Sequence, residues 1–240
     1  MSSSYPQEDY LEYSDPFAAL AKADERSAFI TKTYMNLATA IAGLVVLEIL
    51  LFQIPGIEQL VHLMIGTQGS WLVVLGLFMG VSWLANSWAL GATDIKLQYA
   101  GLWLYVVAQA FILLPFLYYA YGFYPDAIFM AAGTTLALFG LLTGVVFFTR
   151  HDFSFLWPFL LFGGLAAMGL IVVSLLFSFN LGVIFAYAMV AFACCYILYD
   201  TSNVMHHYRT SQHAAAALAL FASVVLLFWY ILQIFLSRRD

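Results

Sequence analysis

The stretch "AAAALALFASVVLLFWYIL", residues 214–232, contains no charged residue. A helix that rises about 1.5 Å per residue needs about 20 apolar residues to cross about 30 Å of hydrocarbon. Extended to 214–236, this run meets that length and predicts a membrane-spanning helix. The whole chain agrees, because 64% of its 240 residues are hydrophobic and 9% are charged, against about 25% charged residues in an ordinary soluble domain. A soluble globular protein is excluded.

The same run carries a stripe of small or hydroxyl-bearing side chains at spacings of three and four. Its members are Ala216, Ala219, Ser223, Leu226, Tyr230, Gln233 and Ser237. Such a spacing puts the stripe on one face of a helix. Lipid offers no hydrogen-bond partner to hydroxyl groups, so this face should meet other helices. We therefore expect the last helix to be central.

Six further apolar runs precede it, at 33–52, 71–90, 100–119, 127–148, 155–177 and 181–199. No run alternates with a period of two, which argues against a transmembrane barrel of strands. The predicted fold class is an all-α membrane protein, a seven-transmembrane-helix bundle with a central last helix. Residues 53–70 place Ile54, Ile57, Val61, Leu63 and Met64 on one helical face, which predicts a short amphipathic segment at the outer interface.

Residues 1–26 form an acidic tail ahead of the membrane domain, 27–240. The tail contains six of the thirteen acids: Glu8, Asp9, Glu12, Asp15, Asp24 and Glu25. We expect it to be mostly disordered, with a short helix at 16–26 that Asp15 caps. It lacks the basic and apolar regions of a signal peptide. Its role is either simple solvation or attachment to a cytoplasmic partner or protease.

The basic residues predict the orientation. With the amino terminus in the cytoplasm, six of the eight basic residues face inward: Lys22, Arg26, Lys32, Lys96, Arg150 and Arg209. The loops at 53–70, 120–126 and 178–181, on the opposite side, contain no lysine or arginine. Arg238 and Arg239 would lie on the external side of the membrane. The positive-inside rule thus favours a cytoplasmic amino terminus and an external carboxyl terminus.

Two acids lie in or at the predicted spans. Glu48 lies near the outer end of the first span and is either a solvated acid at the mouth or part of a cation-attracting ring. Asp200 closes the sixth span, with Tyr196 one turn earlier on the same side. A carboxylate at the carboxyl end of a helix meets the negative pole of the helix dipole, so a cation, a proton or a donor should compensate it. Solvation or capping of the chain turn is the alternative role for Asp200.

Three motifs in order resemble the Bax inhibitor family. They are "FITKTYMNLATAIAG" (29–43), "TRHDFSFLWPFLL" (149–161), and "YILYDTSNVMHHY" (196–208) with the last apolar run after it. The resemblance implies six helices around a central seventh and a pH-sensitive calcium leak. Its bacterial, YccA-like branch implies a protein of the bacterial inner membrane that restrains a membrane-bound AAA protease.

The family's leak mechanism rests on two aspartates that share a proton. The first maps onto Asp200, whereas the position of the second is Ser223. A serine cannot share a proton in this way, but it can donate a hydrogen bond to Asp200. We therefore expect pH to act through His206 and His207, because histidine changes its charge near neutral pH. An arginine that the family has near the inner end of span two is also missing, with Lys96 a little farther on.

The predicted ion path or gate comprises Asp200, Ser223, Glu48, Tyr196 and Tyr230. Asp152 or Ser154 is expected to cap the fifth span by accepting from its free amides. No histidine or lysine lies deep in a span to activate a serine, no Schiff-base lysine is present in the last span, and the histidines do not converge on a zinc site. We therefore expect no enzyme activity, no bound metal or cofactor and no nucleic-acid partner. Calcium enters only as a transported ion. Two functions stay open: a cation leak channel in contact with membrane lipid, and a non-transporting partner of a membrane protease.

Overall fold

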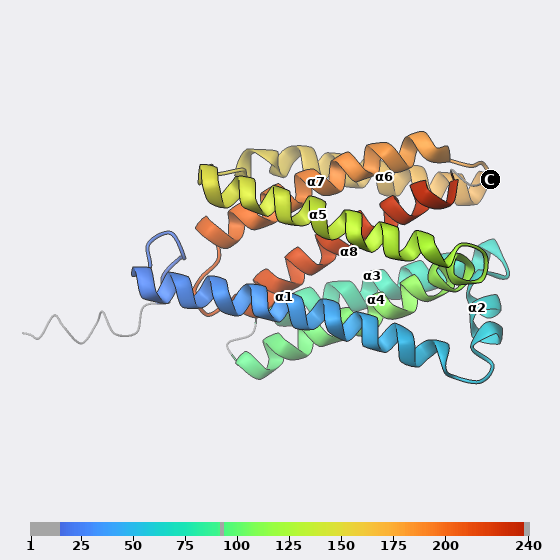
Figure 1. Cartoon of the computed structure of the whole chain (residues 1–240), viewed down its shortest axis with the longest axis horizontal. Helices are drawn as coiled ribbons and strands as arrows, with labels where there is room; N and C mark the ends of the chain where they lie inside the picture. The colour runs from blue at the N-terminus through green and yellow to red at the C-terminus, as the bar shows by residue number, and fades with distance from the viewer. Residues whose placement is uncertain (1–14, 92–93, 238–240) are drawn as a thin grey trace, which may run out of the picture.

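The computed structural model describes residues 15–91 and 94–237. Its helices in chain order are α1 (Ala23–Phe52), α2 (Ile57–Ile65), α3 (Gln68–Gly91), α4 (Ile95–Phe123), α5 (Pro125–Thr149), the short 3-10 helix η1 (Ser154–Leu156), α6 (Trp157–Phe177), α7 (Gly182–His206) and α8 (His213–Ser237). Figure 1 shows the long helices side by side, with α2 across one end of the bundle.

Seven helices in the described ranges are long and apolar enough to cross a membrane, as the sequence predicted. The boundaries differ most in two places. The first helix begins at Ala23 rather than at residue 33, and α7 continues to His206 instead of ending at residue 199. Polar residues in both extensions hid these helical turns from a hydropathy reading. The missed turns matter because they move Asp200 from the end of a helix to its interior.

The last helix is central, as predicted. In its most apolar window 72% of the residues of α8 are buried inside the protein, against 17% for α5 and for the span that contains α6. α8 contacts α1, α3, α4, α5 and α7. Small residues at its start, Ala214 to Ala217, are buried and let the neighbouring helices approach. α4, with 61% of its window buried, shares the interior with α8.

A glycine sets the spacing of the hairpin of α3 and α4. A Cβ added at Gly101 would lie 2.5 Å from the carbonyl oxygen of Ala85 and 2.9 Å from the amide nitrogen of Ala89. Both are backbone atoms, which cannot rotate away. Only a residue without a side chain permits this approach of the two helices.

The predicted amphipathic segment is α2, but its face is narrower than the sequence indicated. Ile57, Val61 and Met64 are buried. Ile54 and Leu63 are exposed, because the helix begins only after Gly56, whose φ of 81° allows the turn, and because Leu63 lies on the opposite side from Val61. The buried face packs on α3 and α4.

Residues 15–21 do not form the predicted helix, and Asp15 does not cap it. Phe17 instead forms an isolated antiparallel bridge with Arg209, in the loop between α7 and α8. The amide of Ala18 donates to the carbonyl of Tyr208 at 2.8 Å, and the Asp15 carboxylate accepts from the amide of Ser211 at 3.0 Å. The tail prediction for residues 1–14, and the side on which Arg238 and Arg239 lie, fall outside the described residues.

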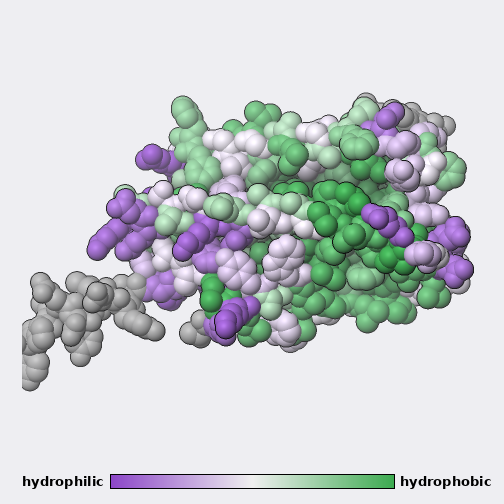
Figure 2. Space-filling model, turned by 60° about the horizontal axis from the view of Figure 1, so that its bottom comes forward, coloured by the Kyte–Doolittle hydropathy of each residue, from purple (hydrophilic) through white to green (hydrophobic). Residues whose placement is uncertain are grey.

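The surface matches a membrane environment. Large apolar side chains such as Trp83, Phe129, Phe148, Phe162 and Phe177 are exposed. In Figure 2 hydrophobic residues cover the middle of the visible face, and hydrophilic residues gather toward its two ends. A protein in water could not expose so much apolar surface, so this surface contacts lipid.

Candidate functional site

The centre of the candidate site is a contact between α7 and α8. The hydroxyl of Ser223 donates a hydrogen bond to the Oδ2 atom of Asp200. Both side chains are buried, with 7% of Asp200 and 4% of Ser223 exposed. The hydrogen bond that the sequence analysis expected between Ser223 and Asp200 is therefore present, and it lies inside the protein rather than at an open mouth.

The local sequence explains why Asp200 points inward. α7 continues for almost two turns beyond it, and the next residues, Thr201 and Ser202, are fully buried. Polar residues at the end of an apolar run predict a loop when the helix is assumed to face only lipid. Here these residues face other helices, which satisfy or enclose their polar groups. Asp200 thus meets α8 from within a helix, and a helix-end dipole is not needed to account for its position.

Asp200 has no basic partner among the described residues. Its hydrogen bond comes from a neutral hydroxyl, and the ion pair between the described side chains lies elsewhere, at Asp152 and His207. An isolated charge in an apolar interior is costly. The carboxyl group must therefore hold a proton or attract a cation.

Three further hydroxyl groups lie in α1, α5 and α7. Tyr34 of α1 is close enough to Thr143 of α5 and Thr201 of α7 to interact with both. None of the three oxygens has a partner with hydrogen-bond geometry in the structure, although all three are buried. If the helices separate, such hydroxyl groups can bind water or act as oxygen ligands of a cation. The sequence did not reveal Tyr34, Thr143 and Thr201, because hydroxyl side chains on three different spans form no motif.

Tyr208, in the loop between α7 and α8, lies near Asp200. Burial raises the pKa of its phenol, and the nearby Asp200 and Tyr199 raise the pKa further. Tyr208 therefore stays protonated and can act as a donor at neutral pH. Its backbone carbonyl accepts from Ala18, so the docked segment 15–21 is attached to a residue beside the site.

A second polar network joins α1, α4 and α8. The side-chain amide of Asn36 lies 3.1 Å from Nδ1 of His213, and the hydroxyl of Tyr99 donates to the Asn36 oxygen at 3.4 Å. His213 is 8% exposed. The network joins the first turn of α8 to α1 and α4.

The two predicted tyrosines lie on the α6 side of α7 and α8. The hydroxyl of Tyr196 lies 3.5 Å from the carbonyl oxygen of Leu160 in α6, and its ring packs against Phe192. Tyr230 packs edge to face on Phe185, two turns along α8 from Ser223. Neither tyrosine makes a hydrogen bond to Asp200 in the described structure.

Glu48 is not the solvated acid at the mouth that the sequence left as one alternative. Its side chain is 7% exposed, and it lies on the face of α1 that buries Leu37, Ala40 and Leu44. Neither carboxyl oxygen has a hydrogen-bond partner among the described residues. Glu48 is buried because it follows Leu44 by four residues, which places it on the interior face of α1.

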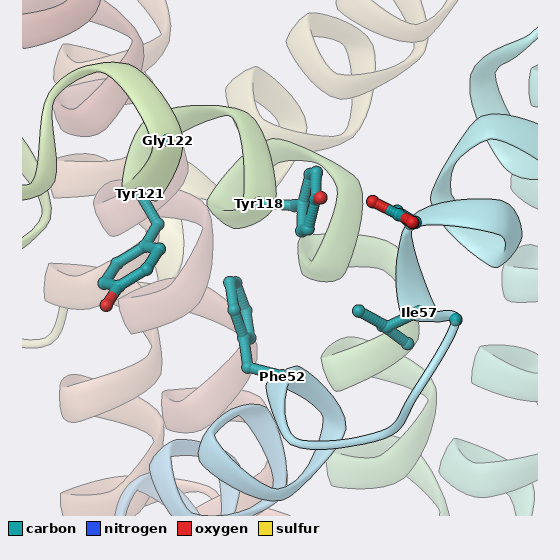
Figure 3. Close-up of a pocket in the computed structure, with 7 residues that line it drawn as sticks. Phe52, Ile57, Tyr118, Tyr121 and Gly122 are labelled. Carbon is teal, nitrogen blue, oxygen red and sulfur yellow. The ribbon is translucent and has the colours of Figure 1, made fainter.

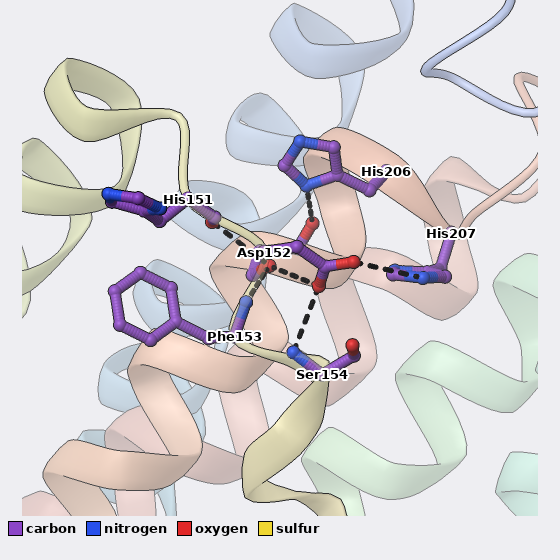
Figure 4. A network of polar contacts seen from close by, with 7 residues as sticks. His151, Asp152, Phe153, Ser154, His206 and His207 are labelled. Carbon is purple, nitrogen blue, oxygen red and sulfur yellow. Dashed lines mark hydrogen bonds and ion pairs between the residues drawn. The ribbon is translucent and has the colours of Figure 1, made fainter.

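The predicted pH-responsive residues belong to a separate cluster at the end of α7 (Figure 4). The Asp152 carboxylate accepts from the amide of Ser154 at 2.9 Å and from the Ser202 hydroxyl at 3.3 Å. Nε2 of His207 lies 3.6 Å from Oδ2 of Asp152, and Nδ1 of His206 lies 3.0 Å from the carbonyl oxygen of Ser202.

Asp152 and Ser154 differ in their roles. Burial raises the pKa of Asp152, but the hydrogen bonds from Ser154 and the nearby His207 and His206 outweigh it and lower the pKa. Ser154 is not a cap, because it is the first residue of η1 and supplies the amide that Asp152 accepts. No three side chains of His, Cys, Asp or Glu in the described ranges are grouped to hold a metal ion.

Seven apolar helices around a buried carboxyl group define the class: an integral, multi-pass α-helical membrane protein. Within that class, the model of the family "Inhibitor of apoptosis-promoting Bax1" matches residues 26–240. The chain therefore belongs to the Bax inhibitor family. It is also similar to the uncharacterized protein PA2604 of Pseudomonas aeruginosa, with 36% identity over 105 residues. That similarity covers 43% of this chain and 46% of the relative, so the chain spans less than half of that protein's length.

Proposed function

We propose that this protein is a cation leak pathway, with calcium as the transported ion and Asp200 as the gate. The observation that carries the proposal is the buried carboxyl group of Asp200, which has a neutral serine as its hydrogen-bond partner. In a membrane bundle an ionisable side chain without a charged partner commonly marks an ion or proton path. Structural charges are normally paired, and Asp200 is not paired in the described structure.

The proposed gate works by separation of α7 and α8. In the present arrangement Asp200 and Ser223 are buried, so an ion cannot reach the carboxylate without movement of these helices. When they part, Asp200 loses its serine donor and gains water, and it then binds a passing cation. The hydroxyls of Tyr34, Thr143 and Thr201 supply further oxygen atoms along this path, and calcium takes oxygen ligands. Glu48 supplies the second buried acid, near the other end of α1.

The proposed response to pH lies outside the gate. Ser223 offers no second carboxyl group, so Asp200 cannot share a proton with an acidic neighbour. His207 instead contacts Asp152, in the segment between α5 and α6. Protonation of His207 strengthens this contact by charge attraction and holds the end of α7 to that segment. Acid should therefore restrain α7 and reduce the leak.

The proposed location is the inner membrane of a bacterium, with the amino terminus in the cytoplasm. The start of α1, the start of α4 and the loops after α5 and α7 carry the basic residues Lys22, Arg26, Lys32, Lys96, Arg150 and Arg209. These elements lie at one end of the bundle, and a basic end faces the cytoplasm.

Calcium flux into liposomes that contain the purified full-length protein tests the proposal. We expect calcium entry above the background of empty liposomes, and at least a several-fold change with Asp200→Asn. Asp126→Asn, which removes an exposed acid from the first turn of α5, is the matched control and should leave the flux unchanged. Flux equal to that of empty liposomes from acid to neutral pH refutes the leak pathway.

One observation favours a second candidate function, a non-transporting partner of a membrane AAA protease. The site has one acid and one serine, so a switch made of two acids is absent from it. Under this alternative Asp200 and Ser223 only fasten α7 to α8. Co-purification from native membranes should then recover a protease, and Asp200→Asn should leave the recovery unchanged. Loss of the recovered protease on removal of residues 1–14 would assign its binding to the tail.

A further inference from the structure

A pocket at the α2 end of the bundle is lined by aromatic rings and one acid. Its volume is about 400 Å³, and its lining residues are Phe52, Gly56, Ile57, Glu58, Tyr118, Tyr121 and Gly122. A water molecule takes up about 30 Å³, so the pocket has room for an organic group. It is separate from Asp200 and Ser223, which do not line it.

Three rings from two helices form one side of the pocket (Figure 3). The centroid of Phe52, the last residue of α1, lies 6.0 Å from that of Tyr118 and 5.7 Å from that of Tyr121. The Tyr121 ring is turned by 74° from the Phe52 ring, whereas the Tyr118 ring is turned by 31°. Ile57, at the start of α2, lies on the other side of the same space.

The electrostatics of the pocket favour a cation. The faces of aromatic rings are negative, and Glu58 adds a carboxylate to the same lining. Glu58 has no ion pair with a described residue. The lysines and arginines that the structure describes lie toward the other end of the bundle, the nearest in sequence being Lys32 and Lys96.

The lining does not suit a bare metal ion. Calcium takes about six to eight oxygen ligands, whereas the pocket offers one carboxylate and two phenol groups. A cation with apolar methyl groups fits better, because it gains from contact with ring faces and needs no oxygen shell. Aromatic cages recognise quaternary ammonium groups in this way.

We infer that this pocket binds a methylated ammonium cation, held by the rings of Phe52, Tyr118 and Tyr121 and by the carboxylate of Glu58. The last turns of α1 and α4 place it near the membrane surface, at the level of lipid headgroups. The same chemistry is offered by the choline headgroup of a lipid and by a soluble ion such as choline. The inference does not depend on the proposed leak pathway.

Binding of tetramethylammonium to the full-length protein in maltoside micelles tests the inference by isothermal titration calorimetry. We expect saturable binding that is absent with ammonium at the same ionic strength. Tyr118→Leu should weaken it by about fivefold to thirtyfold, since a cation–π contact contributes about 1–2 kcal/mol. Glu58→Gln should also weaken it, because it removes the negative charge from the lining. Tyr118→Phe, which keeps a ring, should bind nearly as the unmodified protein does.

Two matched controls separate the pocket from general surface effects. Tyr119→Leu removes an exposed ring one residue away that does not line the pocket, and Asp126→Asn removes an exposed acid of α5. Both should leave the affinity unchanged. Glu58 is exposed, so Glu58→Gln should fold normally even if Tyr118→Leu does not.

Native mass spectrometry from lipid nanodiscs distinguishes the two sources of the cation. Retention of phosphatidylcholine over phosphatidylglycerol, lost in Glu58→Gln, identifies a lipid headgroup. Tetramethylammonium binding without such retention identifies a soluble ion. The inference is overturned if tetramethylammonium does not bind, if ammonium binds equally well, or if the controls weaken binding as much as the pocket variants do.

Discussion

Removal of the Ser223 hydroxyl should measure how strongly α7 is held to α8. Ser223→Ala deletes one buried oxygen atom and leaves the Oδ2 atom of Asp200 without its donor. The residue is 4% exposed, so water cannot simply replace the hydroxyl. A hydrogen bond to a charged group contributes about 1.5–3 kcal/mol in soluble proteins, whereas bonds between membrane helices average about 0.6 kcal/mol and reach about 1.7.

The burial and the acidic acceptor place this bond at the upper end of the membrane range. We expect Ser223→Ala to lower the free energy of unfolding by about 1.5 kcal/mol, or about tenfold in the unfolding equilibrium constant. Reversible unfolding by SDS in mixed micelles, followed by tryptophan fluorescence, provides the measurement. The control is Ser174→Ala, because the Ser174 hydroxyl bonds to the carbonyl of Ile171 in its own helix.

A double-mutant cycle with Asp200→Ala isolates the contact from other effects of either substitution. We expect a coupling energy of about 1 kcal/mol or more between positions 200 and 223. A coupling below about 0.3 kcal/mol, which is within the error of independent sites, would mean that the serine does not hold the carboxyl group. The gate described above would then lose its physical basis.

Three other predictions concern the fold and the cluster at the end of α7. Gly101→Ala should destabilise the protein by about 3 kcal/mol or more in the same SDS assay, because its Cβ meets backbone atoms of α3, whereas Gly140→Ala, with nothing within 4 Å, should be neutral or stabilising. Asp152→Asn should lower the melting temperature at neutral pH, and only slightly, because Asp152 is 46% exposed. A carboxyl group whose pKa is lowered by folding stabilises the fold at pH values above its unfolded pKa. The difference between the two proteins should therefore vanish as the pH falls through the lowered pKa of Asp152. A difference that grows in acid would contradict this assignment. Asp15→Ala should speed hydrogen exchange at Ala18, Thr210 and Ser211, whose amides bond across the docked segment, and unchanged exchange there would show that Asp15 does not hold the loop.

Hydropathy was sufficient to predict the seven spans, and the stripe on the last apolar run predicted the central position of α8. A span is recognised by its length and by its lack of charged residues. The hydroxyl groups of the stripe find hydrogen-bond partners only on other helices. The spans and the stripe were accessible because each depends on residues that are close in sequence. The contact of Ser223 with Asp200 was expected from the resemblance to the Bax inhibitor family, in which these two positions act together.

The features that the sequence did not reveal depend on distant partners. Periodicity identifies the inward face of a helix but not the helix that it meets, so the contact of Tyr196 with α6 was not foreseen. The bridge of Phe17 with Arg209 joins backbone segments almost 200 residues apart and leaves no side-chain pattern. The last turns of α7 were missed for another reason, because Thr201 and Ser202 are polar yet buried in protein rather than in lipid.

The position of α8 has a consequence for biogenesis. Because α8 is the final helix in chain order, the ribosome releases the centre of the bundle after all the helices that enclose it. Until then the inward faces of α1, α5 and α7, which carry Glu48, Thr143 and Asp200, have lipid or each other as neighbours. Polar and ionisable side chains in contact with lipid are costly. A chain interrupted before residue 213 should therefore be less stable than the full protein, although its six completed spans are long and apolar enough to cross a membrane.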